Sequence, residues 1–64
     1  MYSMQIFKSH KMDSMEDAER ALQELRERYS EEKGWREIYG VIESLGNGMF
    51  RACLRLEHLE GNLD

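Results

Sequence analysis

The feature that most constrains the fold is a run of apolar residues spaced three and four positions apart. Met15, Ala18, Leu22, Leu25 and Tyr29 recur at these steps, which is the spacing of one face of an α-helix. Polar and charged residues fill most of the positions between them. The pattern predicts an amphipathic helix with one face on a core and the other in water.

Residues suited to helix ends stand on either side of this run. Asp13 or Ser14 can cap the free amide groups of the first turn. Lys33 suits the negative end of a helix, and Gly34 is typical of the residue just beyond it. We therefore predict a helix over about residues 14–33, roughly 30 Å long.

Segments before and after the helix have the composition of β-strands. Residues 2–9 alternate between two faces, with Met4 and Ile6 on one of them. Residues 35–45 and 49–59 are rich in aromatic and aliphatic side chains and flank a glycine turn, which is typical of a β-hairpin. We predict a single α+β domain over residues 1–64, of β-α-β-β order. Its three-stranded antiparallel sheet is covered on one face by the helix, with the first strand antiparallel to the third.

The register of the hairpin depends on its loop. A two-residue Asn47-Gly48 loop and a three-residue Gly46-Asn47-Gly48 loop place opposite faces of the second strand beside the third. We favour the three-residue loop, which sets Glu43 opposite Arg51 and Tyr39 opposite Arg55. In that register the face toward the helix carries Ile38, Gly40, Ile42, Phe50, Ala52, Leu54 and Leu56.

The opposite face of the hairpin is too apolar for a surface that only meets water. It combines aromatic and aliphatic side chains with arginines, as the cores of protein interfaces do, and it also carries Glu37 and Glu43. We predict that this face binds a ligand or another chain. With the shorter loop, its aromatic residues would belong to the core instead. The predicted contact residues are Trp35, Tyr39, Val41, Arg51, Cys53 and Arg55.

The balance of charge is acidic, with 13 acidic and 9 basic residues and a formal net charge of −4. This sign opposes direct binding to nucleic acid. The acids concentrate on the predicted helix, where they are typical of a solvated face but could also meet a basic partner. That acidic surface would consist of Glu16, Glu19, Glu24, Glu27, Glu31 and Glu32.

No pattern of catalytic or metal-binding residues is found. The separations of His10, Cys53 and His58 match no zinc pattern, and Cys53 and His58 would point to opposite faces of one strand. The hairpin glycines do not lie between a strand and a helix, where phosphate-binding loops occur. We expect a non-enzymatic protein in which Cys53 is a small apolar filler.

The size of the chain favours association. A chain of 64 residues buries only about 60% of its unfolded surface, so we expect support from self-association or from a partner. A single cysteine cannot form an internal disulfide. No segment resembles a signal peptide or is apolar enough to span a membrane, so we expect a cytoplasmic protein without membrane attachment.

Three segments resemble the dodecins, a family of small flavin-binding proteins. They are Ser14-Met15-Glu16-Asp17-Ala18 at the helix start, Trp35-Arg36-Glu37-Ile38 at the start of the second strand, and Asn47-Gly48 at the turn. Their spacing and the order of elements are similar to those of the family over most of the chain. The resemblance implies a hollow dodecamer whose sheets line the interior, with Trp35 stacked on the flavin ring. Arg51 stands where the family has a glutamine that meets the flavin.

Two functional hypotheses follow. The first is a small acidic binding protein that acts as a homo-oligomer, dodecin-like, with a flavin-type planar ligand at the sheet face. The second is an acidic inhibitor or regulator of the phage or mobile-element type, which docks on a basic groove of a nucleic-acid enzyme. An enzyme would need a site built between subunits, since one chain offers no paired catalytic groups.

Overall fold

The structure is a computed structural model, which describes residues 2–59. The predicted domain also includes residues 1 and 60–64, which lie outside this description. The elements are β1 (Tyr2–Lys8), α1 (Met15–Arg28), a short 3-10 helix (Glu31–Lys33), β2 (Trp35–Gly46) and β3 (Met49–Leu59).

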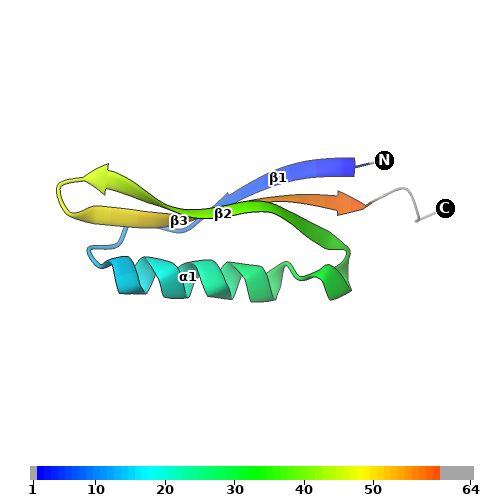
Figure 1. Ribbon diagram of the computed structural model, residues 1–64, viewed down its shortest axis with the longest axis horizontal. Helices are drawn as coiled ribbons and strands as arrows, with labels where there is room; N and C mark the ends of the chain where they lie inside the picture. Colours follow the sequence, from blue (N-terminus) through cyan, green and yellow to red (C-terminus); the bar gives the residue numbers. More distant parts are fainter. Residues whose placement is uncertain (1, 60–64) are drawn as a thin grey trace.

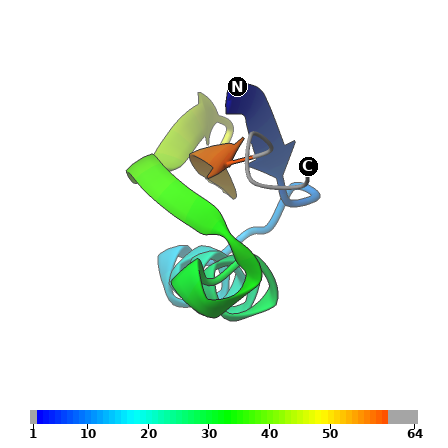
Figure 2. The same ribbon diagram turned by 90° about the vertical axis from the view of Figure 1, so that its right-hand side faces the viewer.

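The strands form one antiparallel sheet of order β1-β3-β2, and α1 lies along one face of it (Figure 1). Viewed along the sheet, no other described element lies on the face opposite α1 (Figure 2). The predicted α+β class, the β-α-β-β order and the antiparallel pairing of the first and third strands are confirmed.

The helix begins where predicted but ends earlier. Ser14 caps α1, and its Oγ accepts a hydrogen bond from the backbone N–H of Asp17 at 3.3 Å. The predicted end near residue 33 is wrong, because Tyr29 leaves the helical conformation at φ −119° and ψ 70°. Its ring stacks on Phe7 of β1 with centroids 3.9 Å apart. Tyrosine and serine are also weaker helix formers than the residues before them, so the helix stops in favour of this contact.

The hairpin turn contains two residues instead of the predicted three. Asn47 and Gly48 both have positive φ, 53° and 71°, as a two-residue type I′ turn requires. Gly46 pairs with Met49, and Leu45 is an extra residue in β2 that shifts the register back by one. The predicted loop is therefore wrong. The register predicted for the middle of the hairpin is right, since Glu43 pairs with Arg51 and Tyr39 with Arg55.

A second extra residue in β2 changes which side chains face the helix. Ile38 lies between the pairs Glu37–Leu56 and Tyr39–Arg55 without a partner of its own in β3. Such a bulge reverses the alternation of the residues before it. Trp35 and Glu37 therefore face α1 and not the opposite side as predicted. Ile38, predicted in the core, is 44% exposed.

The core lies between α1 and the adjoining face of β3. Only Leu54 and Leu56 are large side chains with less than 2% exposure in the described part of the chain. A core this small stabilises a single chain weakly, which favours further burial by association. The buried cluster consists of Ala21, Leu22, Ala52, Leu54 and Leu56, with Phe7, Met12, Leu25, Tyr29, Trp35 and Ile42 packed against it.

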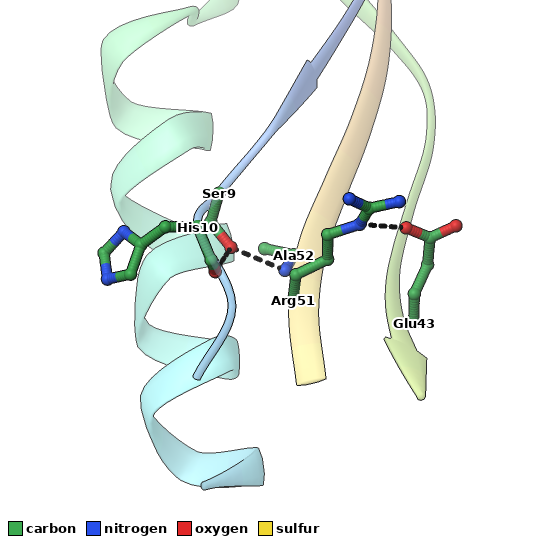
Figure 3. A network of polar contacts seen from close by, with 5 residues as sticks. All are labelled: Ser9, His10, Glu43, Arg51 and Ala52. Carbon is green, nitrogen blue, oxygen red and sulfur yellow. Dashed lines mark hydrogen bonds and ion pairs between the residues drawn. The ribbon is translucent and has the colours of Figure 1, made fainter. Parts of the chain in front are cut away.

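The connection from β1 to α1 is fixed against β3. Ser9 N donates to the Ala52 carbonyl at 2.9 Å, and Ser9 Oγ accepts from Ala52 N at 2.8 Å (Figure 3). Met12 and Phe50 exchange two backbone hydrogen bonds of 2.7 and 2.6 Å. These contacts hold the start of α1 over the sheet.

Candidate functional site

The sheet face opposite α1, called the open face below, carries five of the six predicted contact residues. Residues paired across antiparallel strands share a face, so the register assigns each strand's contribution. No described element covers this surface (Figure 2). The register places on it Met4, Ile6 and Lys8 from β1, Arg51, Cys53, Arg55 and Glu57 from β3, and Arg36, Tyr39, Val41 and Glu43 from β2; the unpaired bulge residue Ile38 is added because it is exposed beside Tyr39.

Exposed large apolar side chains gather on the open face. Of the six in the described chain, Met15 is on the helix and the other five are on this face. Scattered apolar side chains are ordinary on protein surfaces, whereas a contiguous set marks a contact site. The five are Met4 at 48%, Ile6 at 51%, Ile38 at 44%, Tyr39 at 39% and Val41 at 44% exposure.

Arg55 lies at the centre of the open face. The register places it between Ile6 and Tyr39, and its guanidinium carbon is 5.9 Å from the centroid of the Tyr39 ring, a cation–π distance. Its Nε is buried and has no hydrogen-bond partner among residues 2–59. A buried N–H without an acceptor is destabilising. The half-buried Arg55 side chain thus carries a cation for which residues 2–59 supply no carboxylate.

Glu57 lies two residues from Arg55 on the same face of β3. The register places it between Met4 and Arg36, and the Arg36 guanidinium forms an ion pair with Glu57 Oε1. Glu57 is only 9% exposed although it belongs to the uncovered face. A carboxylate has acceptor sites for more than one donor, so Glu57 can also receive a second guanidinium.

The next rows of the open face contain Cys53 and Arg51. Cys53 lies between Lys8 and Val41 and is 4% exposed, which fits the predicted role of a small filler. Arg51 Nε donates to Glu43 Oε1 at 2.7 Å (Figure 3). This hydrogen bond lowers the pKa of the Glu43 carboxyl below its ordinary value; burial opposes the shift, and the charges of Arg51 and Lys8 add to it.

Arg55 differs from the other arginines of the open face in its partners. Arg51 pairs with Glu43 and Arg36 with Glu57. No carboxylate of the described chain pairs with Arg55. Among these three arginines, Arg55 is therefore the one without a carboxylate partner in residues 2–59.

Trp35 lies on the other side of the sheet from the remaining predicted contact residues. Its ring meets Phe7 and Tyr29 edge-on at centroid distances of 5.8 and 5.3 Å, and it lies 4.5 Å from the ring of His58. The bulge at Ile38 causes this reversal. A ligand bound at the open face would therefore not stack on Trp35.

The six predicted acidic residues of the helical region are all exposed. Basic residues interrupt them, since Arg20 pairs with Asp17 at 3.5 Å and Arg26 with Glu37 at 2.9 Å. The surface is therefore mixed in charge and not uniformly acidic. The residues are Glu16, Glu19, Glu24, Glu27, Glu31 and Glu32.

The residues that could bind metal are dispersed. Cys53 is on the open face, whereas His58 Nε2 lies 3.2 Å from the Lys33 carbonyl on the helix side, which confirms that they point to opposite faces. No group of three or more His, Cys, Asp and Glu side chains in residues 2–59 is arranged to hold a metal ion. None of the described helices has both the length and the apolar character that a membrane span needs.

Sequence reasoning missed part of the open face. The alternation of residues 2–9 places Met4 and Ile6 on one side of the strand, but only the pairing with β3 shows that this side adjoins Arg55. Glu57 was not predicted as a contact residue. Its position two residues after Arg55 was the signal that could have found it.

Comparisons of the chain with models of protein families, with curated proteins and with solved structures found no match. The functional argument therefore depends on the open face itself. Its relevant properties are five exposed apolar side chains on the two outer strands, a central arginine without a carboxylate partner among residues 2–59, and a buried carboxylate beside it.

Proposed function

We propose that the protein is a small non-enzymatic binding protein that acts as a homo-oligomer and associates through its open face. The observation that carries this proposal is the gathering of five of the six exposed large apolar side chains on one uncovered sheet face. Burial of such a surface is the main source of favourable free energy in protein association.

The small core supports the same proposal. Two large side chains are fully buried in the described chain, and chains of this length commonly need a disulfide, a metal or association to fold stably. The one cysteine cannot supply an internal disulfide. Association would extend the core across the sheet.

The test uses two residues of equal exposure. Val41 on the open face and Met15 on α1 are both 44% exposed. Light scattering behind size-exclusion chromatography, over a series of protein concentrations, should show an oligomer for the wild type and for Met15→Glu. Val41→Glu should shift toward the monomer, because it places a charge inside the contact. A wild-type monomer at every concentration would contradict the proposal.

The resemblance to dodecins extends the proposal to a planar, flavin-type ligand held between open faces. In this proposal Tyr39 stacks on the ligand in place of Trp35, because Tyr39 is exposed on the open face and Trp35 faces α1. Titration with a flavin should quench its fluorescence in the wild type, and Tyr39→Ala should weaken the binding. An oligomer that leaves flavin fluorescence unchanged would end the flavin proposal and leave self-association standing.

The alternative of an acidic inhibitor has weaker support. Its six acids are exposed, but Arg20 and Arg26 interrupt the surface they would form. Binding to a basic nucleic-acid enzyme would have to weaken steeply as salt is added. Association through the open face should be far less sensitive to salt, because much of its surface is apolar.

A further inference from the structure

We propose that two copies pair their open faces about a two-fold axis that crosses β3 between Arg55 and Glu57, so that Arg55 of each copy binds the partner's Glu57. The inference rests on the proposed self-association and specifies its geometry. It assigns the half-buried guanidinium of Arg55 the carboxylate that residues 2–59 of its own chain do not provide.

The position of the axis follows from where the apolar side chains lie. A row here is the set of residues paired across the three strands. Met4 of β1 is in the row of Glu57, and Ile6 of β1 and Tyr39 of β2 are in the row of Arg55. Three of the five exposed apolar side chains therefore flank these two charged residues, while Ile38 lies beside Tyr39 at the bulge and Val41 is level with Cys53. Interfaces commonly have this arrangement, with buried central residues enclosed by side chains that exclude water.

A two-fold interface must be complementary to itself, because residue i meets residue j of the partner and j meets i. An axis across the strands between Arg55 and Glu57 exchanges their two rows. Glu57 then lies against the partner's Arg55, and Met4 against the partner's Ile6. Each strand faces the same strand of the partner, so on β2 Arg36 lies against the partner's Tyr39, where a cation–π contact can form. On each of the three strands the facing groups are thus complementary: opposite charges on β3, apolar side chains on β1, and a cation with an aromatic ring on β2.

Other axes do not satisfy Arg55. An axis parallel to the strands along β3, or across them through Arg55, places Arg55 against the partner's Arg55. An axis through Cys53 places it against the partner's Arg51, and like charges at close range repel. An axis between Cys53 and Arg55 offers it only the partner's Cys53, a weak acceptor. The axis between Arg55 and Glu57 is the one of these that provides a carboxylate.

The size of the face predicts a weak dimer. The seven residues of β1 run about 23 Å, and the outer strands of a three-stranded sheet are about 10 Å apart. Such a face is smaller than most stable specific interfaces and is of the size found in weak, transient ones. We expect the dimer to dissociate on dilution, so its mass must be measured over a concentration series.

Charge reversal in separate copies tests the pairing. Arg55→Glu and Glu57→Arg should each weaken self-association at least about tenfold, because each leaves like charges facing across the axis. An equal mixture of the two variants should recover the dimer to within about threefold of the wild-type affinity, because opposite charges face each other again. Arg20→Glu, on the exposed face of α1, is the matched control and should leave the dimer unchanged.

A second measurement avoids dependence on the folding of the charge variants. In a Cys53→Ala background, Met4→Cys and Ile6→Cys variants are mixed and oxidised. The proposed axis brings position 4 of one copy to position 6 of the other, so the crosslinked heterodimer should exceed both crosslinked homodimers.

The outcomes separate the two proposals. A wild type that stays monomeric at every concentration overturns both. A wild-type dimer overturns this axis alone if the folded charge variants do not recover on mixing, or if crosslinking shows no preference for the heterodimer. Recovery on mixing together with preferential crosslinking supports it.

Discussion

Arg26 on α1 and Glu37 on β2 form a two-pronged ion pair, with Arg26 Nε 2.9 Å from Oε1 and Nη2 3.1 Å from Oε2. The pair lies over Gly40. A Cβ at this position would come within 2.8 Å of Arg26 Nη2 and 3.3 Å of Leu22 Cδ1. The absence of a side chain at Gly40 therefore makes room for the contact between the helix and the edge strand.

Gly40→Ala is expected to lower the free energy of unfolding by about 1 kcal/mol, because Arg26 must move off Glu37 and a partly exposed ion pair is lost. In an Arg26→Ala background the same change should be neutral or stabilising by about 0.5 kcal/mol, since alanine loses less chain entropy on folding than glycine. Urea unfolding of the four proteins, at one fixed protein concentration, measures the difference. Equal effects in both backgrounds would contradict this account of Gly40.

The aromatic contact between β1 and the end of α1 should couple energetically. The rings of Phe7 and Tyr29 are nearly parallel, with 11° between their planes. In a double-mutant cycle of Phe7→Leu and Tyr29→Leu, we expect a coupling free energy of about 1 kcal/mol, the size found for aromatic pairs. Phe7→Leu with Tyr39→Leu is the matched control, because Tyr39 is on the opposite face. A coupling near zero for Phe7 and Tyr29 would show that the stack stabilises only through burial.

The number and order of the elements were predictable from local patterns. The three- and four-residue steps from Met15 to Tyr29 specify a helix, and Asn47-Gly48 specifies a hairpin whichever loop forms. The early end of α1 was not predictable in this way, because it depends on a ring of β1 distant in the sequence, that of Phe7. The weak helix propensity of Tyr29 and Ser30 and this tertiary contact act in the same direction there.

The sequence predicted the candidate site correctly only for the hairpin residues that follow the bulge at Ile38. Tyr39, Val41 and Arg55 share the open face because the register from residue 39 onward matches the predicted one. One extra residue at Ile38 moves Trp35 to the opposite face, and period-two alternation contains no signal for such an insertion. The pairing of β1 with β3 likewise had to be seen before Met4 and Ile6 could be joined to Arg55.

The cap of α1 is expected to contribute measurably to stability. Ser14→Ala removes the side-chain acceptor of the Asp17 amide and should lower the free energy of unfolding by about 1 kcal/mol. Ser30 provides a matched control, because it precedes the short 3-10 helix without a side-chain cap hydrogen bond. Urea unfolding should therefore show a much smaller effect for Ser30→Ala. Similar losses for the two variants would mean that the Ser14 hydroxyl does not act as a cap.

The hydrogen bond from Arg51 to Glu43 predicts a dependence of stability on pH. It lowers the pKa of Glu43 in the folded chain below the ordinary value of 4.5. Above that value the carboxylate is ionised in both states, and its contribution to stability is complete. As the pH falls, the unfolded chain takes up the proton first, so the contribution declines and is lost once the pH passes the folded pKa.

Glu43→Gln should therefore be less stable than the wild type at neutral pH, and the difference should shrink toward zero as the pH falls below 4.5 and through the lowered pKa of the folded chain. Urea unfolding at a series of pH values measures the difference. Glu27→Gln is the control, because Glu27 is an exposed carboxylate of α1 without an ion pair in the described chain, and its difference from wild type should not follow this course. If the difference in unfolding free energy between the wild type and Glu43→Gln stayed constant as the pH fell below 4.5, the Arg51 pair would not favour the ionised form.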